Sequence, residues 1–174
     1  MPNHFDNMLS MRYLIVMTNE QWTETGEAVT ALILDVFRLN GRLVLAGDRL
    51  VSEFGLTSAR WQILGAIAYA ERPESVACHA RNMGVHRQGV QRIVNELKNE
   101  GVVGFEPNPN HKRAHLVVMT PKGKKLFDAA IKRQVPWVNE LSEGLSPEDV
   151  ATAQLVISQL KDRLEEMSMQ QDPA

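Results

Sequence analysis

The sequence predicts a mainly α-helical fold with a small β-hairpin. Near both ends of the chain, apolar residues recur at alternating steps of three and four, the spacing of one helix face. Between these segments lie two short helical patterns separated by a glycine, followed by two short apolar runs around a turn rich in proline and asparagine. With 174 residues and 44% apolar composition, the chain can form one domain together with helices that pair with a second copy.

The first helix is expected to be long. Residues 1–17 are rich in methionine and show no clear period, so we interpret them as an N-terminal extension. Thr18 and Gln21 have the spacing of a capping box, which predicts a helix from there to about Phe54 and a first segment over 18–56. Asn40-Gly41 could interrupt it, but the apolar seam continues in phase across the pair: Val29, Leu32, Val36, Leu39, Leu43, Ala46 and Leu50.

The middle of the chain, residues 57–120, has the pattern of a helix-turn-helix followed by a hairpin. Its three helices are expected at about 58–70, 75–83 and 87–100, with Thr57 and Ser75 as caps of the first two and Gly84 in the turn. The apolar runs at 102–105 and 116–119 predict two strands. Their connection carries a basic tip, His111-Lys112-Arg113, so the order is that of a winged helix-turn-helix.

Residues 121–174 are expected to form the C-terminal helices. Pro121 suits the first turn of a helix, and Pro136 should kink or divide that helix. Ser146 and Pro147, followed by two acids, predict the start of the last helix. Its apolar positions again step by three and four: Val150, Ala153, Ile157, Leu160, Leu164 and Met167.

Positive charge is concentrated in the middle of the chain. Between His79 and Arg133 there are eleven Lys and Arg against four acids, a balance of +7, although the whole chain has a net charge of −2. The remainder therefore carries −9. A basic block between acidic flanks favours a polyanionic partner for the middle segment, and a merely solvated surface is the alternative.

The helix at 87–100 shows which side chains could meet such a partner. Its inward stripe is Val90, Ile93, Val94 and Leu97, and no acid occurs before Glu96 on the opposite face. Arginine and amide side chains suit guanine and adenine edges in the DNA major groove, and backbone N–H groups near Ser75 could meet a phosphate. The candidate DNA-binding residues are Ser75, His86, Arg87, Gln88, Gln91, Arg92, Asn95, His111, Lys112 and Arg113.

These residues resemble the multiple antibiotic resistance regulator (MarR) family of winged helix-turn-helix transcription regulators. In that family the recognition helix ends at a Leu-x-x-x-Gly stop, matched here by Leu97 and Gly101. The wing then ends in Leu-Thr-x-x-Gly, matched by Met119, Thr120 and Gly123 with Met in place of Leu. The wing usually carries Asp-x-Arg, but here His111 replaces the acid while Arg113 remains.

The resemblance implies an obligate homodimer, formed by the N- and C-terminal helices, that places two recognition helices on a palindromic operator in double-stranded DNA. Packing of the first helix against the last within one chain is the alternative use of the two seams. The expected regulator is a repressor released by a small aromatic or phenolic effector, with no other cofactor. The candidate dimerisation residues are Val29, Leu32, Val36, Val150, Ala153, Ile157, Leu160 and Leu164.

Other functions have weaker support in the sequence. A winged helix that serves as a protein-interaction module without touching DNA is the alternative function, but it would need an apolar outer face on the helix at 87–100. The sequence shows no catalytic motif, metal-ligand cluster or bilayer-spanning segment, so we expect neither an enzyme nor a metal site nor a membrane partner. The single cysteine, Cys78, and the absence of a signal pattern point to the cytoplasm, and a redox role for this thiol is a minor alternative.

Overall fold

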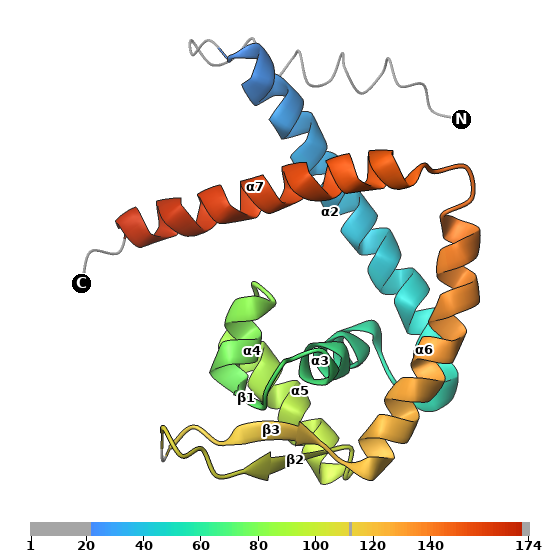
Figure 1. Cartoon of the computed structure of the whole chain (residues 1–174), viewed down its shortest axis with the longest axis vertical. Coiled ribbons are helices and arrows are strands. Elements are labelled where there is room, and N and C mark those ends of the chain that lie inside the picture. The colour runs from blue at the N-terminus through green and yellow to red at the C-terminus, as the bar shows by residue number, and fades with distance from the viewer. Residues whose placement is uncertain (1–21, 112, 172–174) are drawn as a thin grey trace.

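The computed structural model describes residues 22–111 and 113–171. Three long helices form an open frame, and a smaller module of short helices and a sheet is attached to one end of it (Figure 1). The elements in chain order are α2 (Glu24–Val51), the 3₁₀ turn η1 (Ser52–Phe54), α3 (Ser58–Ala68), β1 (Glu74–Ser75), α4 (Val76–Asn82), α5 (Arg87–Asn99), β2 (Val103–Glu106), β3 (Leu116–Met119), α6 (Pro121–Leu141) and α7 (Pro147–Gln171). This mainly helical fold with a hairpin wing confirms the predicted fold class.

The long helix α2 begins later than the sequence predicts. Thr23 is its N-cap, and the Thr23 hydroxyl accepts a hydrogen bond of 3.0 Å from Gly26 N–H. The predicted start at Thr18 is therefore wrong for α2, since Trp22 and Thr23 are not helical, and Thr18 and Gln21 lie outside the described residues. The helix does continue through Gly41, as the unbroken seam predicts.

The hydrophobic core lies between α3, α4, α5 and the sheet. Its fully buried members include Leu64, Val94, Leu97 and Val117. Helix α2 joins this core at Gly47, where an added Cβ would lie 2.8 Å from the Ser58 hydroxyl oxygen. Asp48 accepts a 2.6 Å hydrogen bond from Ser58 N–H in the same region. The end of α2 is thus fixed to the start of α3, and the module cannot be reoriented without disturbing that contact.

The sheet has three strands in the order β1-β3-β2, all antiparallel. The hairpin of β2 and β3 was predicted, but β1 was not. Glu74 pairs with Val117 and Ser75 with Leu116. A strand of two residues has no alternating pattern to be recognised in the sequence, because its pairing with β3 is a tertiary contact.

The C-terminal helices are confirmed with one correction. Helix α6 runs from Pro121 to Leu141 and contains Pro136, so the predicted division at that residue does not occur. A proline removes only one backbone donor, and the hydrogen-bonded turns on either side keep the helix continuous. Ser146 caps α7 by accepting a 3.0 Å hydrogen bond from Asp149 N–H, as predicted.

The long helices carry apolar side chains that the described residues leave exposed. Phe37 and Leu39 of α2 are 68% and 55% exposed, and Leu164 of α7 is 63% exposed. Every residue of α7 within 147–170 except Leu160 is exposed. The two seams therefore do not cover each other within one chain. No helix in the described residues is both long and apolar enough to cross a membrane.

Candidate nucleic-acid interface

Helix α5 separates its residues into a buried stripe and an exposed polar face. Val90, Val94 and Leu97 are buried in the core of the module. The opposite face contains the residues that the sequence predicts for DNA contact: Arg87, Gln88, Arg92 and Asn95 are exposed and Gln91 is half-buried. These five residues line one shallow surface depression. The structure thus brings five of the predicted residues together on one helix face.

The first turn of α5 has no side-chain cap. His86 occupies the N-cap position with an extended backbone, φ −64° and ψ 129°, and makes no capping hydrogen bond. The first N–H groups of a helix have no partner within the helix, and the helix dipole is positive at this end. An exposed histidine and arginine at such an end provide a position where an anionic oxygen would be stabilised.

Two pairs of side chains on α5 contact each other. Gln91 Nε2 donates to Asn95 Oδ1 at 3.0 Å, and Arg92 lies 3.0 Å from the Glu96 carboxylate. The Arg92 side chain is 72% exposed, so this ion pair is worth only about 0.3–0.5 kcal/mol. Both contacts can therefore be exchanged for contacts with another partner at little cost. The side chains of Arg87 and Gln88 make no hydrogen bond or ion pair with any described residue.

The wing between β2 and β3 presents exposed polar and cationic side chains. His111 and Arg113 are both exposed, while Lys112 lies outside the described residues. The turn is held locally, since Asn108 Oδ1 accepts from Asn110 N–H at 2.9 Å and His111 O accepts from Ala114 N–H at 3.0 Å. Arg113 has no acidic partner among the described residues.

The base of the wing is attached to α5 by a contact that the sequence analysis missed. Lys98 Nζ lies 5.1 Å from the centre of the Phe105 ring, within the range of a cation–π interaction. The ring centre of His115 lies 6.1 Å from that of Phe105. The contact of Lys98 with Phe105 is one link between α5 and the base of the wing. Nothing in the spacing of the sequence indicates it, because it depends on how the hairpin folds back.

Ser75 has a structural position different from the other candidates. It belongs to β1, is half-buried, and its hydroxyl already accepts a 3.3 Å hydrogen bond from Cys78 N–H. The structure therefore places Ser75 as the cap of α4, as predicted. Cys78 itself is half-buried, and burial together with the adjacent Glu74 raises the pKa of its thiol. A raised pKa disfavours the reactive thiolate.

The module is connected to the frame at the exit of the wing. The Thr120 hydroxyl donates to Gly101 O at 2.7 Å and caps α6 by accepting from Gly123 N–H at 3.1 Å. Lys122 Nζ donates to Glu100 O at 2.7 Å, and the Glu100 carboxylate pairs with Arg60 of α3. These contacts join the end of α5, the wing and the start of α6 at one point.

The geometry is that of a winged helix-turn-helix, and comparison with known proteins assigns the family. A family model described as MarR family matches residues 54–114. An uncharacterized protein of Mycobacterium tuberculosis is 35% identical over 122 residues, covering 70% of this chain and 84% of the relative. This chain belongs to the MarR family. The family and fold are those of transcription regulators and not of enzymes.

Other MarR family proteins extend the comparison. The transcriptional activatory protein BadR of Rhodopseudomonas palustris is 27% identical over 130 residues, covering 71% of this chain and 73% of BadR. The crystal structure of AbsC from Streptomyces coelicolor has a TM-score of 0.70 at 19% identity and covers 85% of this chain and 99% of AbsC. A mutant MarR from E. coli, crystallised with operator DNA, has a TM-score of 0.59 at 25% identity and covers 74% and 94% of the two chains.

Proposed function

We propose that this MarR family protein is a homodimeric, sequence-specific DNA-binding transcription regulator. In this proposal α5 enters the major groove of a palindromic operator, and the wing reaches the flanking backbone. The regulator acts as a repressor, and a small molecule releases it from the operator. The polar face of α5 is the observation that carries the DNA-binding part.

Several features of α5 support contact with base edges. The side chains on its exposed face are two arginines, two glutamines and an asparagine, and Glu96 is the first acid. Arginine binds guanine and the amides bind adenine through paired hydrogen bonds, each worth about 1–3 kcal/mol of discrimination. The exposed His111 and Arg113 of the wing provide further hydrogen-bond donors for phosphates. A protein-binding face would instead be expected to expose apolar residues.

The exposed apolar faces of the long helices support the homodimer. Val36, Val150, Ile157 and Leu164 are between 38% and 63% exposed, and all four were predicted as dimer contacts. Val29, Leu32 and Leu160 are half-buried, and Ala153 is exposed. Apolar surface of this extent on a single chain is typical of a surface that a second copy covers. A two-fold axis would then present two α5 helices about one DNA turn apart, roughly 34 Å.

The experiment selects an operator from a random pool of DNA duplexes and measures its affinity by fluorescence anisotropy. The test variant is Arg87→Ala/Arg92→Ala, and the control is Lys161→Ala/Arg163→Ala, which removes the same charge from the exposed side of α7. We expect the test variant to lose at least about a hundredfold in affinity, since two base or phosphate contacts are removed from each subunit. The control should stay within about threefold of the parent.

A result in which both variants lose the same affinity would contradict docking through α5. No selected duplex at all would contradict DNA binding itself. The direction of regulation is tested separately, by transcription from the selected operator placed over a promoter with and without the protein. Activation in that assay would overturn the repressor assignment. This check is necessary because the relative BadR is named a transcriptional activatory protein.

A further inference from the structure

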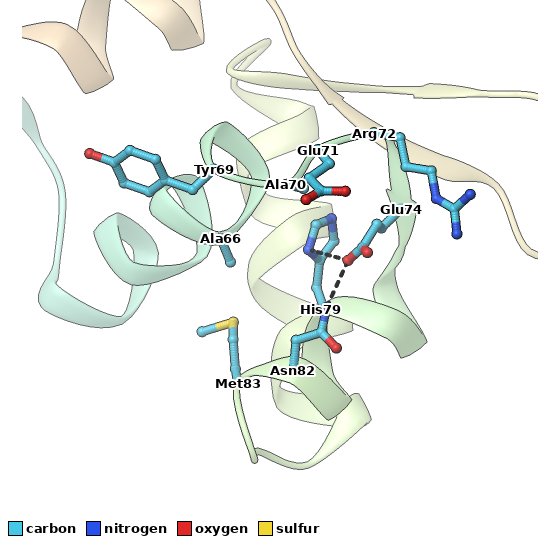
Figure 2. Close-up of a pocket in the computed structure, with 9 residues that line it drawn as sticks. All are labelled: Ala66, Tyr69, Ala70, Glu71, Arg72, Glu74, His79, Asn82 and Met83. Carbon is cyan, nitrogen blue, oxygen red and sulfur yellow. Dashed lines mark hydrogen bonds and ion pairs between the residues drawn. The ribbon is translucent and has the colours of Figure 1, made fainter. Parts of the chain in front are cut away.

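A second polar site lies away from the DNA-facing side of α5. It is a pocket of about 730 Å³ between the C-terminal end of α3, the connection to β1, and α4, and we call it the α3–α4 pocket (Figure 2). Its volume lies within the range of pockets that hold small molecules. Ala66 and Met83 provide an apolar wall, and Glu71, Glu74 and His79 provide a polar one.

His79 is the unusual residue of this pocket. It is 1% exposed, and its Nδ1 faces the Glu74 carboxylate at 3.6 Å. Its Nε2 is buried and has no hydrogen-bond partner among the described residues. A buried polar atom without a partner costs about 1–3 kcal/mol, so a hydrogen-bond donor bound in the pocket would be stabilised by meeting this nitrogen.

The hydrogen-bonding character of that nitrogen can be inferred from its surroundings. Burial lowers the pKa of His79 and Glu74 opposes that effect only in part, so the ring is neutral at pH 7. A neutral imidazole carries one proton, and the carboxylate beside Nδ1 favours the proton there. Nε2 is then a hydrogen-bond acceptor that requires a donor.

The two carboxylates of the wall, on Glu71 and Glu74, are also acceptors. Glu74 is held in place by Asn82, whose Nδ2 donates to Oε2 at 3.0 Å. Glu71 lies on the rim and makes no hydrogen bond or ion pair with a described residue. Figure 2 shows the Arg72 guanidinium turned away from His79. The lining therefore contains two carboxylates, one cation (Arg72) whose guanidinium points away from His79, and a buried acceptor nitrogen beside an apolar wall; near His79 this combination repels anions and attracts cationic donors.

We propose that the α3–α4 pocket binds a small aromatic cation bearing N–H donors, with His79 Nε2 accepting one N–H and the Glu71 and Glu74 carboxylates facing the positive charge. The aromatic ring would lie on Ala66 and Met83. As an effector, a role that rests on the proposed function, such a ligand would act on both DNA-facing elements. Helix α4 leads directly into the turn before α5. Glu74 pairs with Val117 of β3, one of the two strands of the wing.

The binding test uses two ligands of the same shape and opposite charge. Benzamidine carries an amidinium group and benzoate a carboxylate on the same ring. In calorimetric titrations without DNA, we expect benzamidine to bind with a Kd of about 1 mM or below, and benzoate to bind at least about tenfold more weakly. Equal affinities for the two ligands would overturn the proposal. So would the absence of binding heat from benzamidine at a concentration about 10-fold above the expected Kd.

The variants assign the binding to this pocket. Glu71→Gln keeps the size of an exposed side chain and should weaken benzamidine about tenfold, whereas Glu143→Gln, an exposed acid between α6 and α7, should change nothing. In the folded parent, the ¹⁵N NMR signal of His79 Nε2 should move on addition of benzamidine and not of benzoate. Unchanged binding by Glu71→Gln, or an unmoved Nε2 signal, would place the ligand elsewhere and contradict the proposal.

A separate measurement tests the effector role. Saturating benzamidine should weaken operator binding at least about fivefold in the anisotropy assay. Benzamidine binding without any change in operator affinity would overturn the effector role and leave DNA binding intact. If instead no operator is found and benzamidine still binds as described, the proposed function fails while the ligand site stands.

Discussion

Gly123 and Val102 are in such close contact that no other residue fits at position 123. A Cβ added to Gly123 would lie 2.0 Å from the Val102 carbonyl oxygen. The same oxygen accepts a hydrogen bond from Thr120 N–H at 3.1 Å and lies 3.0 Å from the Thr120 hydroxyl, which shares its proton with Gly101 O. This contact holds the entry of the wing against the start of α6, so the position of the wing depends on a glycine in the Met-Thr-x-x-Gly exit.

The first prediction follows from this contact. Gly123→Ala should lower the free energy of unfolding by about 3 kcal/mol or more, because the backbone of Val102 must move and its hydrogen bonds with Thr120 must lengthen. Gly89→Ala is the control, since Gly89 is also the third residue of its helix but has nothing within 4 Å. The control should be neutral or more stable by up to about 1 kcal/mol in urea unfolding. Equal stability of the two variants would contradict the contact.

The second prediction concerns the ion pair between Arg92 and Glu96. Glu96→Gln removes an acid from the edge of the exposed polar face of α5 and frees Arg92. Under the proposed function we expect operator affinity to rise by about twofold to tenfold, since a repulsion of about 1 kcal/mol with a nearby phosphate is lost. Glu143→Gln, an acid outside the module, should leave the affinity unchanged. A weaker complex with Glu96→Gln would mean that Glu96 orients Arg92 for binding.

The third prediction tests the dimer. Ile157→Asp places a charge in the exposed apolar seam of α7, where Ile157 is 43% exposed. Under the proposed function the protein has a mass of about 39 kDa in solution, twice the 19.5 kDa of one chain, and the variant should shift toward the single-chain mass at micromolar concentration. Gln159→Asp, which adds the same charge on another side of α7, should remain dimeric in light-scattering measurements. A parent mass of 19.5 kDa would contradict the dimer.

The sequence predicts the long elements of this fold because their signals are local. Caps such as Thr57 and Ser146 and the seam through Gly41 depend only on residues a few positions apart. The start of α2 was missed because Thr18 and Gln21 have the better capping pattern, whereas the Thr23 cap lacks a glutamate or glutamine three residues later. The strand β1 was missed because it exists only through its pairing with β3.

The candidate DNA-binding face could be predicted, but the α3–α4 pocket could not. The face of α5 follows from the amphipathic pattern of one helix. His79 had a weaker local signal: it is three residues after Val76 and four before Met83, on the inward side of α4. That spacing indicates burial but not a missing partner for Nε2, which depends on α3 and the connection to β1 coming together.

The fourth prediction concerns pH. Burial lowers the pKa of His79 in the folded chain, whereas an unfolded histidine has a pKa of about 6.5. Below about pH 6.5 the unfolded chain therefore binds a proton that the folded chain does not, and the free energy of unfolding should fall as the pH decreases from 7.5 to 5.5. The slope contributed by this residue is at most about 1.4 kcal/mol per pH unit. His79→Gln should reduce the slope, and His86→Gln, at an exposed histidine, should not; identical slopes would contradict the assignment.

The fifth prediction concerns the salt dependence of the proposed DNA complex. If a dimer neutralises about eight phosphates, the logarithm of the operator association constant should fall with the logarithm of salt concentration at a slope near −7. Arg87→Ala/Arg92→Ala removes four cations from a dimer, so any residual binding should show a slope shallower by up to about 4. The Lys161→Ala/Arg163→Ala control should keep the parent slope because its cations lie on α7 and outside the module. A parent slope of about −2 or shallower is too small for two helices and two wings to lie along the phosphate backbone, and would leave groove docking unsupported.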